Sequence, residues 1–251
     1  MNNHTNTTIR KSTQNKVKPL PYPLNILKNY LEKYSPPEKS FIPDGEWEAE
    51  YKMFSMASGR AGHAGTLLFK RKPLSEKEAF IELTIDKAGV DRYWQKTNAK
   101  IKFKTDLLSS PVKWQYESKI TKPNGELFKN TGIKKYAVNQ DGKINVICKH
   151  NKTVIKSSRN IAMSWLLFDA VQRMPKEKNN VSEFTLIDHF DQFKLDNTIS
   201  FQKKIEINTT KKLELYSFLQ LGNGIIPIVY YVDKYGRLLF VVSGIEAYAL
   251  V

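Results

Sequence analysis

The last thirty residues constrain the fold more tightly than any other stretch of the chain. Two apolar runs, residues 225–232 and 238–242, flank the segment Asp233-Lys234-Tyr235-Gly236. This spacing predicts a β-hairpin in which Gly236 takes the positive φ of a bulged turn. Both runs are apolar at successive positions, so we expect both faces of these strands to be covered.

Alternation of apolar and polar residues, the period of a half-buried strand, recurs along most of the chain. Asn124-Gly125 and Asp141-Gly142 are typical of two-residue hairpin turns between such strands. About ten or more antiparallel strands twist and cannot stay flat in one sheet. We therefore predict a mainly β fold, a strongly curved antiparallel sheet or open barrel. The alternating segments are residues 47–53, 79–85, 101–103, 112–120, 199–207 and 213–221.

One apolar segment, residues 160–174, lacks this period. Its only charged or amide side chains after Asn160 are Asp169, Gln172 and Arg173, and Pro175 follows it. A helix without a polar face must be enclosed. We therefore predict one mid-chain helix packed in the concave side of the sheet. Asp169 and Arg173 stand four positions apart and are expected to pair, and they would orient a ligand head group if the helix faced a cavity.

The composition changes twice before the strands begin. Residues 1–18 are polar and basic without any acid, which predicts a disordered arm. Residues 19–45 begin with three closely spaced prolines at positions 19–23, and Leu24, Leu27, Leu31 and Tyr34 follow at helical spacing, which predicts a short helix and a linker outside the sheet. Residues 46–251 are expected to form one curved β domain.

Composition narrows the classes of partner. The formal net charge of +15 is spread along the chain, which favours a lysine-rich solvated face over a nucleic-acid or other polyanion groove. The single cysteine, Cys148, excludes an internal disulfide, and we expect no metal and no cofactor.

No run approaches the ~18 apolar residues of a membrane helix. The polar N-terminus is no secretory signal, so we expect a cytoplasmic protein, or an exported one if the chain is a trimmed mature form.

A long curved antiparallel sheet around a mid-chain apolar helix resembles the LolA/LolB-type lipoprotein-carrier superfamily and its uncharacterised relatives. The resemblance covers residues 46–251 and rests on strand number and helix position. It implies an incomplete barrel that holds an acyl chain under a helical lid. No residue motif of that family is matched, so no functional residue carries over from it.

The most unusual segment is Ser58-Gly-Arg-Ala-Gly-His-Ala-Gly65. Regular glycines let a backbone approach a ligand, and Arg60 with His63 would meet an anion or move a proton. The spacing is neither that of a phosphate-binding loop nor that of a dinucleotide fingerprint. A bulged connection between strands is the simpler interpretation.

Asp188-His189-Phe190-Asp191 places an imidazole between two carboxylates, which permits a general base or a metal ligand but is typical of a turn. Tyr93-Trp94 and Tyr230 offer aromatic rings to a sugar or nucleotide, although aromatic residues on strands are usually core.

Three functions compete. The leading hypothesis is a binding or carrier protein for an apolar or amphipathic small molecule in the concave side of the sheet. The second is an enzyme acting on a polysaccharide or small ester through His63 and Arg60. The third is a scaffold for nucleic acid or another polyanion. The candidate site residues are Arg60, His63, Tyr93, Trp94, Asp169, Arg173, His189, Asp191 and Tyr230.

Overall fold

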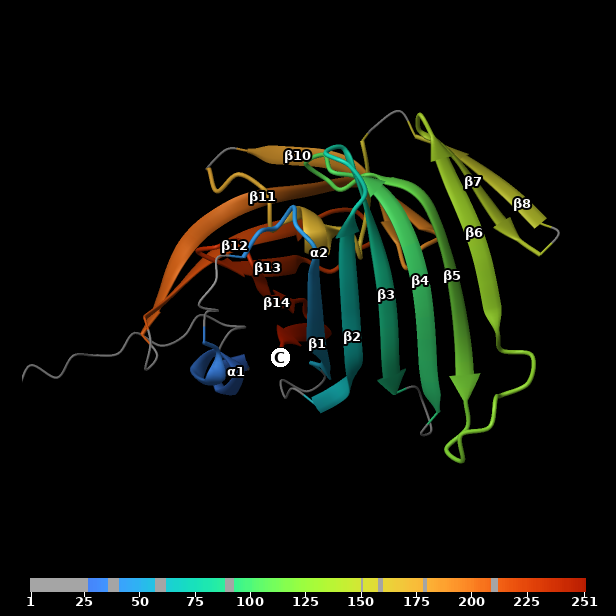
Figure 1. The fold of residues 1–251 in the computed structure, drawn as a ribbon, viewed down its shortest axis with the longest axis horizontal. Helices are drawn as coiled ribbons and strands as arrows, with labels where there is room; N and C mark the ends of the chain where they lie inside the picture. The colour runs from blue at the N-terminus through green and yellow to red at the C-terminus, as the bar shows by residue number, and fades with distance from the viewer. Residues whose placement is uncertain are drawn as a thin grey trace, which may run out of the picture.

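The computed structural model of the chain describes residues 27–35, 41–56, 62–88, 93–149, 151–157, 160–177, 180–208 and 212–251. The predicted disordered arm, residues 1–18, lies outside these ranges. Within them the protein is mainly β, with one 15-stranded sheet and two short helices (Figure 1). The helices are α1 (Lys28–Lys33) and α2 (Leu167–Ala170).

The strands follow one another closely along the chain. Their bounds are β1 (Trp47–Ser55), β2 (Gly62–Pro73), β3 (Glu78–Ala88), β4 (Trp94–Lys104), β5 (Pro111–Thr121), β6 (Ile133–Gln140), β7 (Lys143–Cys148), β8 (Asn151–Lys156), β9 (Ile161–Met163), β10 (Val181–Asp188), β11 (Gln192–Asn208), β12 (Lys212–Leu221), β13 (Ile228–Asp233), β14 (Leu238–Val242) and β15 (Glu246–Leu250).

The sheet is strongly curved and does not close (Figure 1). Its strand order is β8-β7-β6-β5-β4-β3-β2-β1-β15-β14-β13-β12-β11-β10-β9, so the C-terminal strand β15 pairs with β1. This confirms the predicted curved sheet. One pair departs from the antiparallel prediction, because β9 runs parallel to β10. β9 follows β8, the strand at the opposite edge, and joins β10 without a hairpin turn.

Two apolar clusters lie on opposite faces of the sheet. The inner face, defined as the face that α2 contacts, carries the larger cluster, including Phe69, Ile101 and Trp114. The outer face carries a smaller cluster where Leu27 and Leu31 of the α1 region pack with Phe240. Strands β13 and β14 are therefore buried on both sides, as their unbroken apolar runs predicted.

The prediction of a helix over residues 160–174 is wrong for most of its length. Residues 161–163 form strand β9, and only Leu167–Ala170 are α-helical. The segment is nonetheless buried, and Phe168 packs edge-on against Tyr51 of β1 and Tyr248 of β15. Because the segment is buried on every side, it lacks the spacing of polar residues that marks a strand or a helix. Its sequence pattern therefore could not distinguish a buried strand followed by turns from a buried helix.

The predicted C-terminal hairpin is confirmed. β13 and β14 pair across residues 233–237, and Gly236 has φ of +90°. A Cβ atom at Gly236 would come within 2.6 Å of the backbone oxygen of Gln172, so the turn needs glycine for conformation and for space. No helix in the described part of the chain is both long and apolar enough to cross a bilayer.

Candidate functional site

A cavity of about 290 Å³ lies beside α2 at one end of the sheet. Its walls come from α2 and the residues before it, the β10–β11 turn, the β12–β13 connection and the β14–β15 turn. The residues that line it are Ser164, Trp165, Phe168, Leu186, Asp188, His189, Lys194, Gly224, Ile225, Ile226, Ile228, Tyr230, Val241, Ser243, Ile245, Glu246 and Tyr248.

Aromatic and aliphatic side chains form most of the cavity wall. The Phe168 ring stands edge-on to Tyr248 at 5.4 Å and to Tyr230 at 6.2 Å between centroids. Burial is the main cause that raises the pKa of both tyrosines above the ordinary value, followed by the negative charge of Asp188 for Tyr230 and by the charge and hydrogen bond of Glu246 for Tyr248. Both phenols therefore stay neutral at physiological pH and act as hydrogen-bonding groups on an apolar wall.

Charged groups gather at one corner of the cavity. Lys194 Nζ lies 2.7 Å from Asp188 Oδ2, and His189 Nε2 lies 3.9 Å from Asp188 Oδ1. Trp165 is next to them, with its ring centroid 6.1 Å from that of His189. At the rim, the Tyr248 hydroxyl donates to Glu246 Oε2 at 2.7 Å. The cavity thus has an apolar body and one polar corner.

Two polar atoms of this corner have no hydrogen-bond partner among the described residues. They are Trp165 Nε1 and Ser164 Oγ, and both are buried. Trp165 is 5% exposed, so its N–H group has lost water without gaining an acceptor. The indoles of Trp47 and Trp114 instead donate to backbone oxygens at 3.1 and 3.0 Å. Buried donors are almost always paired, so an unpaired one on a residue that lines a cavity suggests a place for an acceptor.

The β10–β11 turn holds the polar corner in place. His189 and Phe190 take positive φ values of +46° and +73°, a conformation that is strained for side chains of their size. Phe190 is fixed by stacking on Tyr116 at 4.6 Å, and its backbone oxygen accepts the indole N–H of Trp114 at 3.0 Å. Asp191 accepts from the Tyr116 hydroxyl at 3.0 Å. The turn therefore bridges from β10 to β5 while presenting His189 to the cavity.

Asp169 and Arg173 pair as the sequence predicted, but they do not line this cavity. Arg173 Nη2 lies 2.6 Å from Asp169 Oδ2, Arg71 Nε lies 2.7 Å from Asp169 Oδ1, and Ser109 donates to Oδ2 at 2.7 Å. Asp44 Oδ1 stands 3.3 Å from Arg173 Nε and 3.9 Å from Arg71 Nη2. Asp169 is fully buried, so this network fixes α2 to β2 and to the β4–β5 turn.

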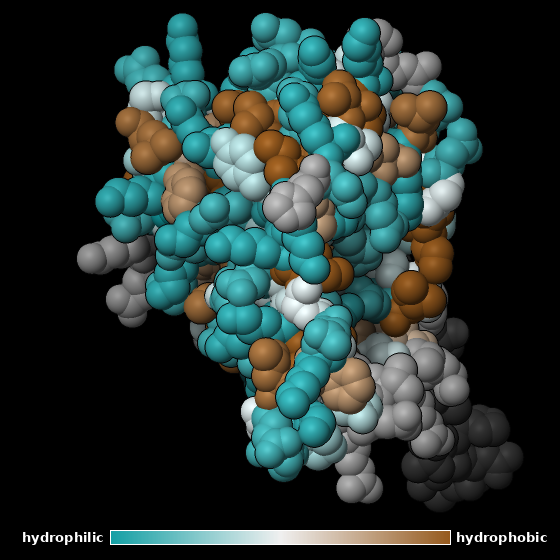
Figure 2. Space-filling model, turned by 90° about the vertical axis from the view of Figure 1, so that its right-hand side faces the viewer, coloured by the Kyte–Doolittle hydropathy of each residue, from teal (hydrophilic) through white to brown (hydrophobic). Residues whose placement is uncertain are grey.

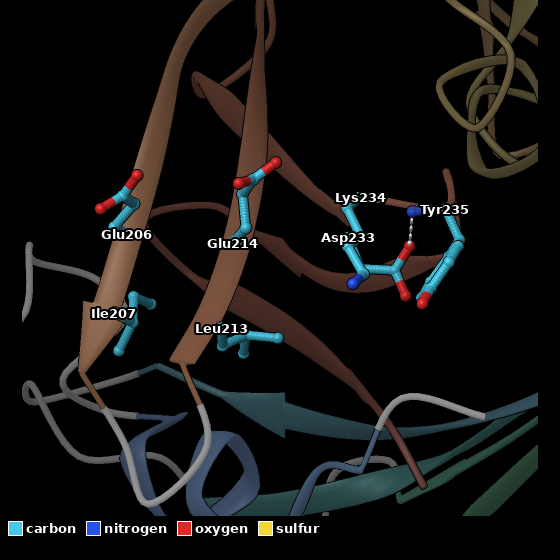
Figure 3. A pocket seen from close by; sticks show the side chains of 7 residues that line it. All are labelled: Glu206, Ile207, Leu213, Glu214, Asp233, Lys234 and Tyr235. Atoms are coloured by element: carbon cyan, nitrogen blue, oxygen red, sulfur yellow. Dashed lines mark hydrogen bonds between the residues drawn. The ribbon is translucent and has the colours of Figure 1, made fainter. Parts of the chain in front are cut away.

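A second cavity of about 290 Å³ lies at the β13–β14 turn, and its lining includes several charged side chains beside Ile207 and Leu213 (Figure 3). Glu206 and Glu214 project from neighbouring strands β11 and β12, and Asp233 faces the turn. Asp233 accepts from the backbone N–H groups of Tyr235 and Arg237 at 2.8 and 2.9 Å. Glu214 lies 2.6 Å from Lys204, whose hydrogen bond is the main cause that lowers the pKa of the carboxyl. These carboxylates already have partners.

The structure brings together only some of the predicted site residues. His189 and Tyr230 line the first cavity, and Asp191 lies in the same turn as His189. Trp94 begins β4 and Tyr93 precedes it, away from the cavity. Arg60 and the side chain of His63 lie outside the described residues. Among the described residues, no group of three or more His, Cys, Asp or Glu residues could hold a metal ion.

The sequence reasoning missed Ser164, Trp165, Lys194 and Glu246. Trp165 was assigned to the interior of a helix, and nothing in the local pattern marks Lys194 or Glu246, because the fold brings them to the cavity from separate turns. Asp188 belongs to the Asp188-His189-Phe190-Asp191 motif. This motif was the only local sequence signal for the polar corner of the cavity.

Comparisons with known proteins bear on the fold. No family model matches the chain, and no curated protein matches it. Among solved structures, it is similar to a beta-barrel-like protein of a domain of unknown function, DUF1849, from Brucella abortus. The TM-score is 0.55 at 11% identity, over 82% of this chain and 96% of the other. At this identity the likeness concerns the barrel-like fold alone, and it does not name a lipoprotein carrier.

Proposed function

We propose that the protein binds an apolar or amphipathic, lipid-like small molecule in the cavity beside α2. The observation that carries the proposal is that two residues lining this largely apolar cavity, Trp165 and Ser164, each have a buried polar atom without a hydrogen-bond partner among the described residues. A few placed polar groups on a concave apolar surface are the usual form of a small-ligand site. A ligand with one polar end would pair both atoms and cover the apolar wall.

The volume of the cavity limits the size of the ligand. About 290 Å³ falls near the lower end of the usual range of roughly 300–1,000 Å³ for ligand pockets. This size suits one acyl chain or a compact ring system and is too small for the several chains of a lipoprotein anchor. The resemblance to lipoprotein carriers therefore supports a single-chain ligand more than a protein-linked one.

The polar corner specifies the end group of the ligand. Trp165 Nε1 can only donate a hydrogen bond, so the ligand must offer an acceptor there. Lys194 and His189 add donors at the same corner, while Asp188 already holds Lys194 at 2.7 Å. A carboxylic acid, ester or hydroxyl oxygen meets this requirement. We place the head group here, rather than at Arg60 and His63 as the sequence suggested.

The test is titration with an environment-sensitive fatty-acid probe. We expect saturable binding by the full chain and about fivefold to tenfold weaker binding by Trp165→Phe, which keeps the ring and removes the donor. Trp94→Phe is the matched control, because Trp94 is exposed and lies outside the cavity. Non-saturable binding, or equal losses in the two variants, would contradict the proposal.

The proposal also says which part of the chain binds the ligand. We assign ligand binding to residues 46–251 and expect residues 1–18 to be dispensable for it. A chain that begins at Pro19 should bind the probe with the affinity of the full chain. Native mass spectrometry of the purified protein would show whether a ligand of this size class is already bound.

A further inference from the structure

The end of the sheet that carries the cavity rim also carries other exposed groups. Ser55 at the end of β1 pairs with Glu246 at the start of β15, and β12 and β13 meet at Gln220 and Ile228. On the other side of β1 in the strand order, Trp94 at the start of β4 pairs with Thr121 at the end of β5. The ladder therefore places the β5–β6 connection and the β14–β15 turn at the same end of the curved sheet.

The β5–β6 tip, defined as residues 119–135 with Trp94 beside them, exposes apolar side chains. Leu127 is 53% exposed, Ile133 46%, Trp94 43% and Phe128 39%. The Phe128 ring rests edge-on against Tyr93 at 5.3 Å, so the aromatic groups form one cluster. Figure 1 shows this connection projecting beyond the lower end of the sheet. Projecting apolar and aromatic groups are costly in water and typical of a contact surface.

The tip is also basic, whereas the β2–β3 and β4–β5 turns at the opposite end are neutral. Residues 119–135 hold five lysines and one glutamate, a net charge of +4. Residues 72–78 hold two lysines and two glutamates, and residues 104–111 hold one lysine and one aspartate, so both turns have a net charge of zero. Basic residues recur along the whole chain, but acidic residues are few in residues 94–157, which hold 14 lysines and 4 acidic residues, +10 of the total +15.

We propose that the β5–β6 tip docks on an anionic lipid bilayer surface. Lysines near such a surface are attracted to its charge, and exposed aromatic and leucine side chains enter the interfacial layer. Both features occur together at the tip. Figure 2, which faces the side of β6–β8, shows hydrophobic patches separated by hydrophilic side chains. That mixture suits a headgroup layer better than a dry protein interface.

Two other partners fit less well. A single-stranded nucleic acid needs free aromatic faces along a basic groove, but Phe128 and Tyr93 are packed on each other. A second copy of the chain would bring two tips of net charge +4 together, which is unfavourable.

Docking by the tip does not require that the cavity bind a ligand, so the inference goes beyond the proposed function. It would place the cavity rim, with the exposed side chains of Ile226 and Ile245, toward the bilayer. An amphipathic ligand would then pass between membrane and cavity without crossing water.

The experiment is co-sedimentation of the full chain with vesicles of phosphatidylcholine alone and of an equal mixture with phosphatidylglycerol. We expect binding to the mixed vesicles that weakens with added salt. Lys122→Glu with Lys129→Glu should weaken it by about tenfold or more, since each lysine near the surface contributes about fivefold. Leu127→Ser with Phe128→Ser should also weaken it.

Matched controls come from the opposite end of the sheet. Lys72→Glu with Lys77→Glu repeats the charge change, and Leu74→Ser with Leu107→Ser repeats the loss of exposed apolar groups. These controls should bind vesicles as the unaltered chain does, and thermal melting verifies that each variant folds. Trp165→Phe should leave vesicle binding unchanged, which separates this test from that of the cavity.

Several outcomes would overturn the proposal. They are no sedimentation of the unaltered chain, equal binding to neutral and anionic vesicles, or equal losses in tip and control variants. Binding of a single-stranded oligonucleotide that the tip variants abolish would assign the surface to nucleic acid. A dimer in sedimentation equilibrium that disappears in Leu127→Ser with Phe128→Ser would assign it to a second copy.

Discussion

The two sides of the α2 segment use buried polar groups in opposite ways. On one side, both carboxylate oxygens of Asp169 are bonded, to Arg71, Arg173 and Ser109. On the other, Trp165 Nε1 and Ser164 Oγ have no partner among the described residues, and their residues line a cavity. The comparison teaches that buried polarity serves stability where a carboxylate gathers it. An unpaired buried atom supports a binding site only where its residue also lines a cavity, because Arg71 Nη2, Arg173 Nε, Asn197 Oδ1 and Gln220 Nε2 also lack a hydrogen-bond partner among the described residues and none of these residues lines this cavity.

The largest expected effect is on the paired side. Asp169→Ala leaves the Arg71 guanidinium buried without its carboxylate, because the Arg71 side chain is 0% exposed. Removing one partner of a buried ion pair costs about 3–5 kcal/mol. Urea unfolding should show this loss. The control is Glu82→Ala, which removes the exposed pair with Lys100 and should cost less than about 1 kcal/mol. Equal costs would mean that the network does not hold α2.

Ser109 and Ser164 allow a direct comparison of the two sides of the α2 segment. Ser109→Ala removes a hydroxyl that donates to Asp169 and accepts from Arg173, and it should cost about 1–3 kcal/mol. Ser164→Ala removes a hydroxyl that has no partner among the described residues, and it should change the unfolding free energy by less than about 0.5 kcal/mol. Urea unfolding of the two variants measures the difference. If Ser164→Ala were as destabilising as Ser109→Ala, its hydroxyl would have a partner and would not be free for a ligand.

Much of the sheet could be predicted from the sequence, because its strands from β1 to β5 have one solvated face and so alternate. Gly236 and the runs beside it gave the C-terminal hairpin for a similar local reason. The segment around Trp165 could not be assigned, because complete burial removes the periodicity that separates helix from strand. The cavity was harder still. Its polar corner joins Ser164, Asp188 and Lys194, which only the tertiary fold brings together.

Filling the cavity should separate binding from stability. Val241→Phe adds a ring at a lining position that is 3% exposed. We expect probe binding to weaken at least about tenfold, while the empty space limits the cost of overpacking to the lower part of the usual ~1–3 kcal/mol. Probe titration and urea unfolding of the same sample give both values. Unchanged affinity would show that the probe binds elsewhere.

Alkaline pH offers a smaller test of the cavity wall. Burial raises the pKa of Tyr230, and it raises that of Tyr231 to about 12. The unfolded chain loses these protons near pH 10, so stability is full below pH 10 and declines as pH rises toward the folded pKa values. Tyr230→Phe should reduce the loss between pH 8 and pH 11 by about 1 kcal/mol in urea unfolding. An unchanged decline would mean that Tyr230 is not buried.

The indole N–H resonances test the central claim most directly. The chain has four tryptophans, and three have a defined state: Trp47 and Trp114 donate to backbone oxygens, and Trp94 is exposed. The fourth, Trp165, has an Nε1 without a hydrogen-bond partner in the part of the chain that the structure describes. On titration with the fatty-acid probe, nitrogen–proton correlation spectra should show the Trp165 indole signal, assigned with Trp165→Phe, moving to a hydrogen-bonded shift at the affinity of probe binding. The Trp47 and Trp94 signals should stay in place. A Trp165 signal that does not move at saturating probe would contradict the account.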